Sequence, residues 1–365
     1  MRILLGYSYY PYSYDIKYWV ESWVSRLNKS GFKIDTVPLT LNPPDHPIWW
    51  PMLDEKWKLG DHELLQFYDN LLKKLENYDV FINWNGINIH PEILKYFPTF
   101  NVYGCFDDPE SSERLSKPVA RFYDLCLIGN IAEIETYKSW GVREVKFWPL
   151  GFMATDANPQ FVETDIMTKS RKFDTCFLGE RKYFPERIKK LDTYSKAFPQ
   201  GMFFGSGWDK GFYPEHKKID LYQNTKIGIN IHNSTGPINF RTYTLPANGV
   251  MQICDNKKYL GKIFELNKEV IGFDDVKEAI ELTRYYLAHN DERIEVALAG
   301  WKRVIKDYNE IAVFALAVKY ITEVINKKKP VTKVEKNIIV SQRRKTSIRR
   351  AKYFLKLKFR RTKSG

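Results

Sequence analysis

Short apolar segments alternate with amphipathic segments of helical spacing along most of the chain, and this alternation constrains the fold more than any other feature. Strands that alternate with helices in this way pair in parallel, and helices cover both faces of the sheet. In the first half we predict strands at residues 2–6, 32–37, 79–83, 100–103, 125–128 and 145–148. In the second half we predict strands at residues 173–178, 201–204, 226–231, 249–253 and 269–272.

The alternation is interrupted once, by a polar and irregular segment at residues 151–171. Segments of this kind commonly join domains. We therefore predict two α/β domains facing each other across a cleft, residues 1–150 and residues 172–308. A closing helix, residues 309–326, is expected to return to the first domain and to precede a tail at residues 327–365.

The composition is that of a folded protein without covalent cross-links. Hydrophobic residues make up 44% of the chain and aromatic residues 15%, well outside the range of disordered proteins. The 4 cysteines are scattered without a Cys-x-x-Cys pair, which argues against a disulfide scaffold and a structural zinc site. The start lacks the apolar run of a signal peptide, and no stretch is long and apolar enough to span a bilayer. We expect a cytoplasmic protein.

The net charge of +13 comes from the tail. Residues 327–365 contain sixteen of the 57 lysines and arginines and a single acidic residue, so the rest of the chain carries a net charge of −2. A charge confined to a tail says little about the partners of the folded body. We therefore expect nucleic acid to be an unlikely partner of the body.

Residues 331–365 combine the basic charge with apolar side chains. Ile348, Ala351, Leu355 and Phe359 can share one face of a helix, which is the pattern of a segment that lies on anionic lipid. Nucleic acid would also attract this segment, and a solvated tail is the structural alternative. We favour a peripheral position on the inner face of the membrane.

Two glycine-containing turns follow predicted strands in the second half. Gly179 and Arg181 come after the strand at 173–178 and before a helix that opens with proline. A glycine lets the backbone approach a phosphate, and the start of the next helix offers free N–H groups. The alternative is an ordinary strand-to-helix turn, and that alternative is favoured for the similar segment at 205–208.

His232, Asn233 and Arg241 follow the next long strand. Polar residues at the carboxyl end of a parallel strand, beside a helix start, lie where α/β proteins bind ligands. The guanidinium of Arg241 can hold a diphosphate with two N–H groups. We predict that these residues bind a diphosphate, although a single histidine in such a place is often only a hydrogen-bonded loop residue.

Asp107 and Asp108 follow a strand of the first half, so their carboxylates should face the predicted cleft. A carboxylate there can take a proton from a hydroxyl as a general base. Asp108 precedes Pro109, however, and aspartate before proline is also a common helix start. Both a catalytic role and helix capping remain open at this point.

Trp84 and Asn85 end another strand of the first half and are candidates for contact with a sugar acceptor. A turn is the structural alternative, and His90 and Glu92 are further candidates of equal weight. Residues 38–60 hold five of the 18 prolines and are expected to form a long loop. Its tryptophans are candidates for an acceptor lid or for local packing; they are Trp49, Trp50 and Trp57.

The sequence offers no pattern typical of a metal site. Its 6 histidines show no ligand spacing, and no Asp-x-Asp motif occurs where a divalent ion would bridge phosphates. We therefore expect chemistry without a metal or other cofactor.

Several motifs resemble, in their order, the group 1 glycosyltransferases, and in particular their spore-maturation-protein-like (CgeB-like) branch. The resemblance covers roughly residues 75–310. Its N-terminal motifs are YGCFDDPE at 103–110, YDLCLIGN at 123–130 and WPLGF at 148–152. In the second half it rests on FLGERKYFPER at 177–187, INIHNS at 229–234 and a segment with Arg241, Tyr243, Ala247 and Gly249.

The resemblance implies the GT-B arrangement of two Rossmann-like domains, with the donor held by the second. It places Thr244 and Asn248 near the nucleoside of the donor. The family usually has a glutamate at position 244, where it binds the ribose hydroxyls. A threonine hydroxyl makes one such bond but not the bidentate pair of a carboxylate.

From the residues and the resemblance we expect transfer of a sugar from a nucleotide-sugar to a glycan or lipid-linked acceptor. Bacterial surface-glycan assembly is the expected setting. The alternatives are a catalytically silent nucleotide- or sugar-binding protein of the same fold, which the residue at 244 favours, and a scaffold tethered by its tail to membrane or nucleic acid.

Overall fold

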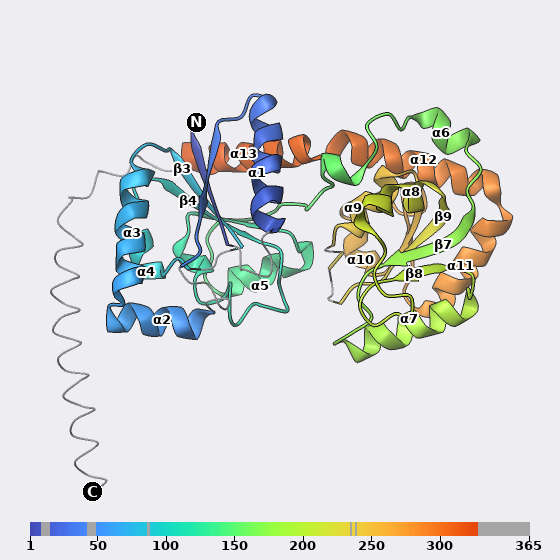
Figure 1. Cartoon of the computed structure of the whole chain (residues 1–365), viewed down its shortest axis with the longest axis horizontal. Helices are drawn as coiled ribbons and strands as arrows, with labels where there is room; N and C mark the ends of the chain where they lie inside the picture. The colour runs from blue at the N-terminus through green and yellow to red at the C-terminus, as the bar shows by residue number, and fades with distance from the viewer. Residues whose placement is uncertain (9–14, 42–48, 86–87, 234–235, 238, 328–365) are drawn as a thin grey trace, which may run out of the picture. The chain divides into compact units, whose positions relative to one another are not determined.

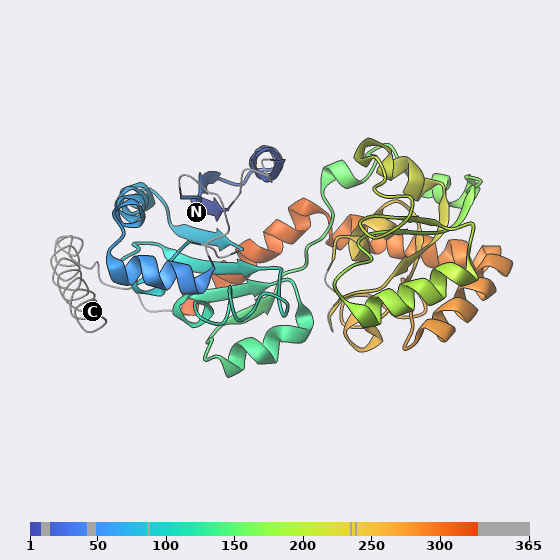
Figure 2. The ribbon, with the colours of Figure 1, turned by 60° about the horizontal axis from the view of Figure 1, so that its bottom comes forward.

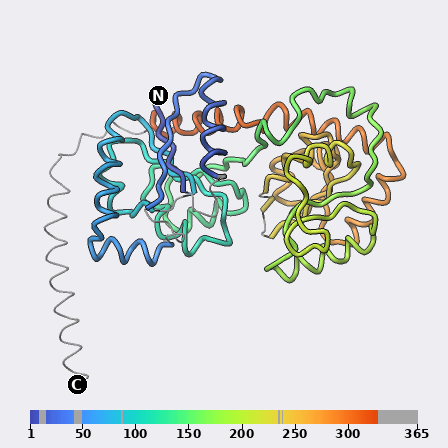
Figure 3. Tube along the Cα trace, in the orientation of Figure 1, coloured from blue at the N-terminus to red at the C-terminus, as the bar shows by residue number. Residues whose placement is uncertain are grey.

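The computed structural model describes residues 1–8, 15–41, 49–85, 88–233, 236–237 and 239–327. These residues form two compact units (Figure 1). The first contains residues 1–128 and 134–146 together with the end of the last helix from Val318; the second contains residues 129–133 and 147–317. The path of the chain through each unit can be followed in Figure 3.

The first unit is built on a six-stranded sheet in the order β2-β1-β3-β4-β5-β6. The chain begins with β1, next to one edge of this sheet, adds β2 as the edge strand on one side and then builds the remaining strands on the other side; β1 to β5 pair in parallel. The strands are β1 Ile3–Tyr7, β2 Ile34–Pro38, β3 Val80–Trp84, β4 Phe100–Cys105, β5 Leu125–Ile128 and β6 Val145–Phe147. The helices are α1 Asp15–Lys29, α2 Trp50–Leu59, α3 His62–Leu75, α4 Pro91–Leu94 and α5 Ile134–Ser139.

The prediction of a continuous loop over residues 38–60 is wrong at its end, because α2 begins at Trp50; residues 42–48 lie outside the described part. Pro51 stands in the first turn of α2, where its missing N–H has no helical acceptor to lose. Gly60 ends the helix in the left-handed conformation. Proline therefore starts this helix and does not prevent it.

The tryptophans of α2 pack around a histidine of the first unit. The imidazole of His90 stacks on Trp57 and Trp50, with ring centroids 4.8 and 5.4 Å apart. Burial lowers the pKa of His90, although Asp54 opposes the shift. Trp50, Trp57 and His90 thus form a local packing cluster.

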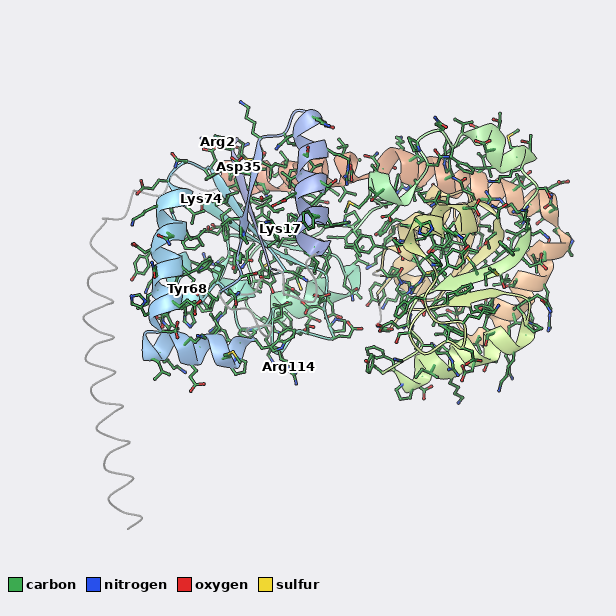
Figure 4. All side chains as sticks on the ribbon, viewed as in Figure 1. Arg2, Lys17, Asp35, Tyr68, Lys74 and Arg114 are labelled. Atoms are coloured by element: carbon green, nitrogen blue, oxygen red, sulfur yellow. The ribbon has the colours of Figure 1, made fainter. Side chains whose placement is uncertain are left out.

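Tyr68 fixes α3 to the segment after β3. Its hydroxyl donates to the carbonyl of Asn88 and accepts from the backbone N–H of His90, both over 2.8 Å. At the other end of the sheet, the guanidinium of Arg2 lies 3.7 Å from the carboxylate of Asp35. Figure 4 labels Tyr68, Arg2 and Asp35 and shows the two members of the ion pair close together.

The second unit repeats the same plan with the strand order β11-β10-β9-β7-β8. Its pairs are parallel throughout. The strands are β7 Phe173–Leu178, β8 Met202–Phe204, β9 Thr225–Asn230, β10 Met251–Cys254 and β11 Ile271–Gly272. The helices are α6 Glu163–Thr168, α7 Pro185–Ala197, α8 Lys218–Gln223, α9 Arg241–Ala247, α10 Lys257–Leu260, α11 Val276–Ala288 and α12 Asn290–Asp307; α13 Glu310–Lys327 follows and ends in the first unit.

Both faces of the second sheet are buried. In β7, Phe177 belongs to the core cluster that includes Leu191 of α7, whereas its neighbour Cys176 packs with Tyr222 of α8 and Leu245 of α9. Successive side chains of a strand point to opposite faces, so each face of β7 has its own core. Figure 2 shows helices above and below this sheet. The predicted fold class, two parallel α/β units, is confirmed.

Much of the segment at residues 151–171 is packed. It contains a short 3₁₀ turn at Ala154–Asp156 and the helix α6, which contacts α12. Ile166 of α6 is only 2% exposed and belongs to the core of the second unit. Polarity alone did not reveal these contacts.

No helix among the described residues is both long and apolar enough to cross a membrane.

Candidate functional site

Each sheet reverses the direction in which strands are added at one point, and most of the predicted site residues lie beside such a point. In the second unit the chain adds β8 on one side of β7 and then β9 on the other. Doubly wound sheets bind ligands outside the carboxyl ends of the two strands at this switch point. Gly179 directly follows β7, and Ile231 to Asn233 directly follow β9.

Arg241 is the central side chain of this edge. Its Nη1 donates to the carbonyl of Leu178 over 2.7 Å, and its Nε donates to Oδ1 of Asn230 over 3.2 Å. The guanidinium carbon lies 4.5 Å from the ring centroid of Phe177. Burial lowers the pKa of Arg241. An arginine nevertheless remains protonated at neutral pH, because its ordinary pKa exceeds 12.

Gly179 leaves the space that Arg241 occupies. A Cβ at position 179 would overlap with Nη1 of Arg241 and would lie 3.1 Å from the ring of Phe177. Glycine therefore permits the close approach of the guanidinium to the backbone. The structure thus brings together two residues that the sequence analysis assigned to one diphosphate site.

A second buried arginine, Arg187 on α7, completes this edge. Its Nε donates to the carbonyl of Ile231 over 3.0 Å, and its Nη1 donates to the carbonyl of Glu180 over 2.7 Å. Its guanidinium carbon also lies over the ring of Phe177, 5.4 Å from the centroid. Burial, followed by the nearby charge of Arg241, lowers the pKa of Arg187 to about 10.

Arg187 is not among the residues that the sequence analysis selects, although the sequence contains a signal for it. In the helix predicted over 185–197 it occupies the same stripe as Leu191 and Tyr194, and all three are buried. A charged residue within the apolar stripe of a helix needs a partner in the interior.

Neither of the two arginines forms an ion pair with a described carboxylate. All four of the hydrogen bonds that they make to described residues go to neutral oxygens, three carbonyls and one amide. The carboxylate of Asp255 lies near enough to favour both cations and that of Glu180 favours Arg187, but neither contacts a guanidinium, and Asp255 is itself bonded to His232. A buried cation without an equal counter-charge is costly to the fold, and an anionic ligand would relieve that cost.

Asn230, at the end of β9, is the centre of a buried amide network. Its Oδ1 accepts from Arg241 and, over 2.9 Å, from Asn239. Its Nδ2 lies 3.1 Å from the hydroxyl of Thr242 and 3.0 Å from Oε1 of Gln252. Because Asn230 is neutral, it orients the guanidinium of Arg241 without cancelling its charge.

His232 belongs to the same network. Its Nδ1 lies 2.6 Å from Oδ1 of Asp255, and its backbone N–H donates to Oδ2 of the same residue over 2.9 Å. Its Nε2 lies 3.3 Å from the hydroxyl of Thr242. The side chain of His232 is buried, whereas the next residue, Asn233, is exposed. Of the two predicted residues, only Asn233 reaches solvent.

His232 and Asp255 also form, with Cys254, the one group of three that could hold a metal ion in the described part of the chain; their ligand atoms lie within 4.8 Å of one another. Its chemistry is poor for this purpose. Burial, followed by the charge of Asp255, raises the pKa of the Cys254 thiol well above its usual value, so the thiol stays protonated. Metal binding requires the thiolate.

Arg181 has a counter-charge, unlike Arg241. Its Nε pairs with Asp192, and its Nη1 donates to the carbonyl of Gly207 over 2.9 Å. The guanidinium carbon lies 5.5 Å from the ring centroid of Trp208. The hydrogen bond that Arg181 donates to Asp192 raises the pKa of Arg181. Arg181 therefore fastens the loop after β7 to the loop after β8.

Thr244 and Asn248 lie beneath the surface of the second unit. Thr244 is 1% exposed, and its side chain lies beside the buried Tyr222. Asn248 ends α9, and its Nδ2 donates to the carbonyls of Asp156 and Thr244 over 2.8 and 2.9 Å. In this structure neither side chain is placed to touch a ligand directly.

In the first unit, Asp107 and Asn85 lie together at the carboxyl ends of β4 and β3. The amide Nδ2 of Asn85 donates to Oδ2 of Asp107 over 2.6 Å. Asp107 is exposed to solvent. Desolvation raises its pKa, the bond from Asn85 opposes this shift, and the charge of Asp108 adds to it. A carboxylate with a raised pKa that reaches solvent is suited to accept a proton.

Asp108 differs from its neighbour because it is only 3% exposed. Its carboxylate accepts hydrogen bonds from the hydroxyls of Ser112 and Tyr137. The segment that follows forms turns and no helix, so the predicted helix capping is wrong. These contacts favour a structural role for Asp108, in which it fixes the loop that carries Asp107.

Trp84 is half-buried among other aromatic rings. It stacks on Trp19 of α1 with ring centroids 5.4 Å apart, and it lies 6.0 Å from both Trp23 and Phe106. This packing fixes the switch point between β1 and β3. Contact between the face of Trp84 and a sugar would compete with the stack on Trp19.

The second unit matches a family of known proteins. Residues 181–314 match the sequence profile of the family described as glycosyl transferase-like. These residues include Arg181, Arg187 and Arg241. A search of the curated proteins finds no match.

The whole chain is similar to solved structures. Sucrose-phosphate synthase from Thermosynechococcus elongatus is 10% identical with a TM-score of 0.60, and the match covers 90% of this chain and 100% of that one. A glycosyltransferase from Rickettsia africae is 9% identical with a TM-score of 0.59, and the match covers 90% of this chain and 99% of that one. HepE from Anabaena, in complex with UDP-glucose, is 12% identical with a TM-score of 0.56, and the match covers 90% of this chain and 100% of that one.

The fold is GT-B. Structural similarity at such low sequence identity establishes the fold. It does not establish the reaction, which has to be argued from the site. The site itself is a cluster of two arginines with neutral partners beside the carboxyl ends of β7 and β9.

A change at Asn230 tests whether the free charge of Arg241 binds anions. Asn230→Asp places a carboxylate of the same shape against the guanidinium and forms an ion pair. We expect the affinity for pyrophosphate, measured by calorimetry, to fall about tenfold or more, because hydrogen bonds to charged groups contribute about 1.5–3 kcal/mol.

Thr242→Val is the matched control, since it disturbs the same network without adding charge. It should leave the affinity within about threefold of wild type if both variants retain the wild-type circular dichroism spectrum. Unchanged binding by Asn230→Asp would show that the anion does not use Arg241.

Proposed function

We propose that the protein is a glycosyltransferase that moves a sugar from a nucleotide-sugar to an acceptor hydroxyl. The observation that carries this proposal is a pair of arginines at the switch point of the second unit, the buried Arg187 and the half-buried Arg241, whose hydrogen-bond partners are neutral. Their location inside the segment that matches the glycosyl transferase-like family supports the same reading. The solved complex of HepE with UDP-glucose makes a uridine nucleotide the first donor to test.

In this proposal the arginines bind the diphosphate of the donor and stabilise the leaving group. When the bond between the sugar and the diphosphate breaks, negative charge develops on the departing oxygen. Fixed cations in a dry site lower the energy of that charge without reorganisation. Gly179 leaves room for the guanidinium of Arg241, and Asn230 holds Arg241 in position.

We propose that the reaction needs no metal ion. The arginines supply the positive charge that a divalent cation supplies in other transferases. Activity that is unchanged after treatment with EDTA would agree with this assignment.

The first unit is proposed to present the acceptor, with Asp107 as the general base. Its carboxylate would take the proton of the attacking hydroxyl, while Asn85 orients it. Trp84 would contribute the exposed part of its ring to acceptor contact. A glycan or lipid-linked acceptor in the assembly of a bacterial surface polysaccharide is our proposed setting.

The pattern from Arg241 to Gly249 places the chain, in our proposal, in the spore-maturation-protein-like branch of glycosyltransferases. Thr244 stands where that branch usually has glutamate, and its burial beside Tyr222 removes it further from the ribose. A silent nucleotide-binding protein of the same fold is the second candidate, and this substitution is the observation that favours it.

Arg241→Gln is expected to abolish the stabilisation of the protein by its nucleotide. A ligand at a hundred times its dissociation constant stabilises the fold by about 2.7 kcal/mol, which raises the melting temperature. The melting temperature is measured with UDP, GDP, dTDP, CDP and CMP in turn, without added metal. One of these nucleotides should raise the melting temperature of the wild type but not that of Arg241→Gln.

Arg284→Gln is the matched control, because Arg284 is an exposed arginine on α11 of the same unit. It should respond to the nucleotide as the wild type does. If none of the nucleotides raises the melting temperature of the wild type, the proposal of a transferase that uses these donors is contradicted. A raised melting temperature without donor hydrolysis or transfer would favour the catalytically silent nucleotide-binding protein.

Asp107→Asn should lower the rate of transfer at least about a hundredfold, the usual contribution of a general base, and leave donor binding intact. The base acts only when deprotonated. Since burial raises the pKa of Asp107, the wild-type rate should fall on acidification at a pH above the usual aspartate value of 3.8. Glu113→Gln, an exposed carboxylate on the same loop, should transfer at the wild-type rate.

We propose further that residues 331–365, which lie outside the described part, bind an anionic membrane surface. The full chain should sediment with vesicles that contain phosphatidylserine, and a chain ending at Lys329 should not. High salt should release the full chain, because each lysine or arginine contributes about 1 kcal/mol through a screened attraction. Binding to RNA in preference to such vesicles would contradict a membrane role.

A further inference from the structure

Two exposed aromatic side chains stand at the ligand-binding edge of the second unit. Tyr183 and Phe212 are each 79% exposed, more than any other large hydrophobic side chain in the described parts of the chain. Tyr183 lies in the loop after β7, and Phe212 lies in the loop after β8. These are neighbouring strands of the sheet, so the two loops leave the same edge.

The two loops are fastened together. The backbone N–H of Arg181 donates to the carbonyl of Ser206 over 2.7 Å, and its side chain binds the carbonyl of Gly207. Gly207 has a φ of +85°, and a Cβ there would overlap with the carbonyl of Arg181. Gly205 donates to the carbonyl of Gly211 over 2.7 Å, which closes the second loop directly before Phe212. Both aromatic residues therefore project from one joined pair of loops, which we call the aromatic rim.

The fold gains little from the ring of Tyr183. Its backbone has a φ of +67°, a left-handed conformation that costs a residue with a Cβ roughly 1–2 kcal/mol. The exposed ring stacks on no other ring of the described chain. A strained, exposed aromatic residue without a packing role is more consistent with binding than with stability.

The aromatic rim adjoins the diphosphate site. The indole N–H of Trp208, in the loop after β8, donates to the carbonyl of Gly179 over 3.0 Å. A Cβ at Gly205 would overlap with that same carbonyl. Two residues of the loop after β8 therefore touch Gly179, which lies beside Arg241 of the proposed diphosphate site.

The chemistry of the aromatic rim fits a nucleoside. Exposed Lys182 directly precedes Tyr183, and exposed Lys210 lies two residues before Phe212, so the rim combines flat apolar rings with ammonium groups. A nucleotide offers a flat base joined to an anion, and stacking of a base on an aromatic side chain contributes about 1–3 kcal/mol.

We propose that Tyr183 and Phe212 stack on the nucleobase of the donor and provide the affinity that separates a nucleoside diphosphate from a bare diphosphate. The inference rests on the proposed function, because it needs the diphosphate to lie at Gly179 and Arg241. It adds a base-binding surface made of the loops after β7 and β8.

The test compares two ligands by calorimetry, the nucleoside diphosphate that stabilises the wild type and inorganic pyrophosphate. Tyr183→Ala and Phe212→Ala should each lower the affinity for the nucleoside diphosphate about tenfold. Each should leave the affinity for pyrophosphate within about twofold of the wild-type value. Tyr183→Phe should behave as wild type, because it keeps the ring. Tyr285→Ala is the matched control, an exposed tyrosine on α11 of the same unit.

Three other outcomes overturn the inference. Unchanged affinity for both ligands would mean that the rim serves something else, such as the acceptor. An equal loss for both ligands would mean that the loops act only through the diphosphate site. If the wild type binds pyrophosphate but discriminates no nucleoside diphosphate from it, the base-binding surface does not exist; if it binds neither ligand, the proposed function fails as well.

Discussion

The partial burial of Arg241 without an ion-pair partner is the constraint on which the site depends. A guanidinium removed from water must find hydrogen-bond acceptors, and the protein supplies the carbonyl of Leu178 and the amide of Asn230. Neutral acceptors keep the side chain in one place while its charge remains available. The absence of a side chain at Gly179 follows from the same constraint, because the guanidinium occupies that space. The stability of the second unit and its affinity for anions are therefore opposed in the free protein and cooperate when an anion binds.

Most of the fold was accessible from the sequence because the strands are buried on both faces. Apolar runs such as Ile3–Tyr7 and Leu125–Ile128 cannot lie at a surface, and many of the turns between strands and helices are marked by glycine and proline. The exceptions have physical causes. The helix α2 begins with a proline-containing turn, which local patterns read as a loop. The helix α6 has too few apolar residues to show periodicity, and its assignment comes from Ile166 packing into a core built by distant strands.

The site was less accessible, because burial and partner choice depend on contacts far apart in the chain. Gly179 and Arg241 could be placed at one edge from topology alone, and the structure shows them in contact. The sequence could not show that Arg181 is paired with Asp192, or that Arg187 points inward to the carbonyl of Ile231. Asp107 and Asp108 are adjacent in sequence yet differ in exposure, since a local turn decides which carboxylate meets Tyr137.

The two units show how one topology supports opposite chemistry. Both sheets reverse direction beside their first strand, and polar residues lie at or next to that point. In the second unit these are Arg187 of α7 and Arg241 of α9, whose partners are neutral, and in our proposal this edge binds the diphosphate. In the first unit they are Asp107 after β4 and Asn85 after β3, beside packed tryptophans, and in our proposal this edge accepts the proton. A reaction that expels a diphosphate and deprotonates a hydroxyl needs both kinds of edge. Neither edge can replace the other, because an arginine beside Asp107 would lower the pKa that suits the carboxylate to its task, and a carboxylate beside Arg241 would cancel its charge.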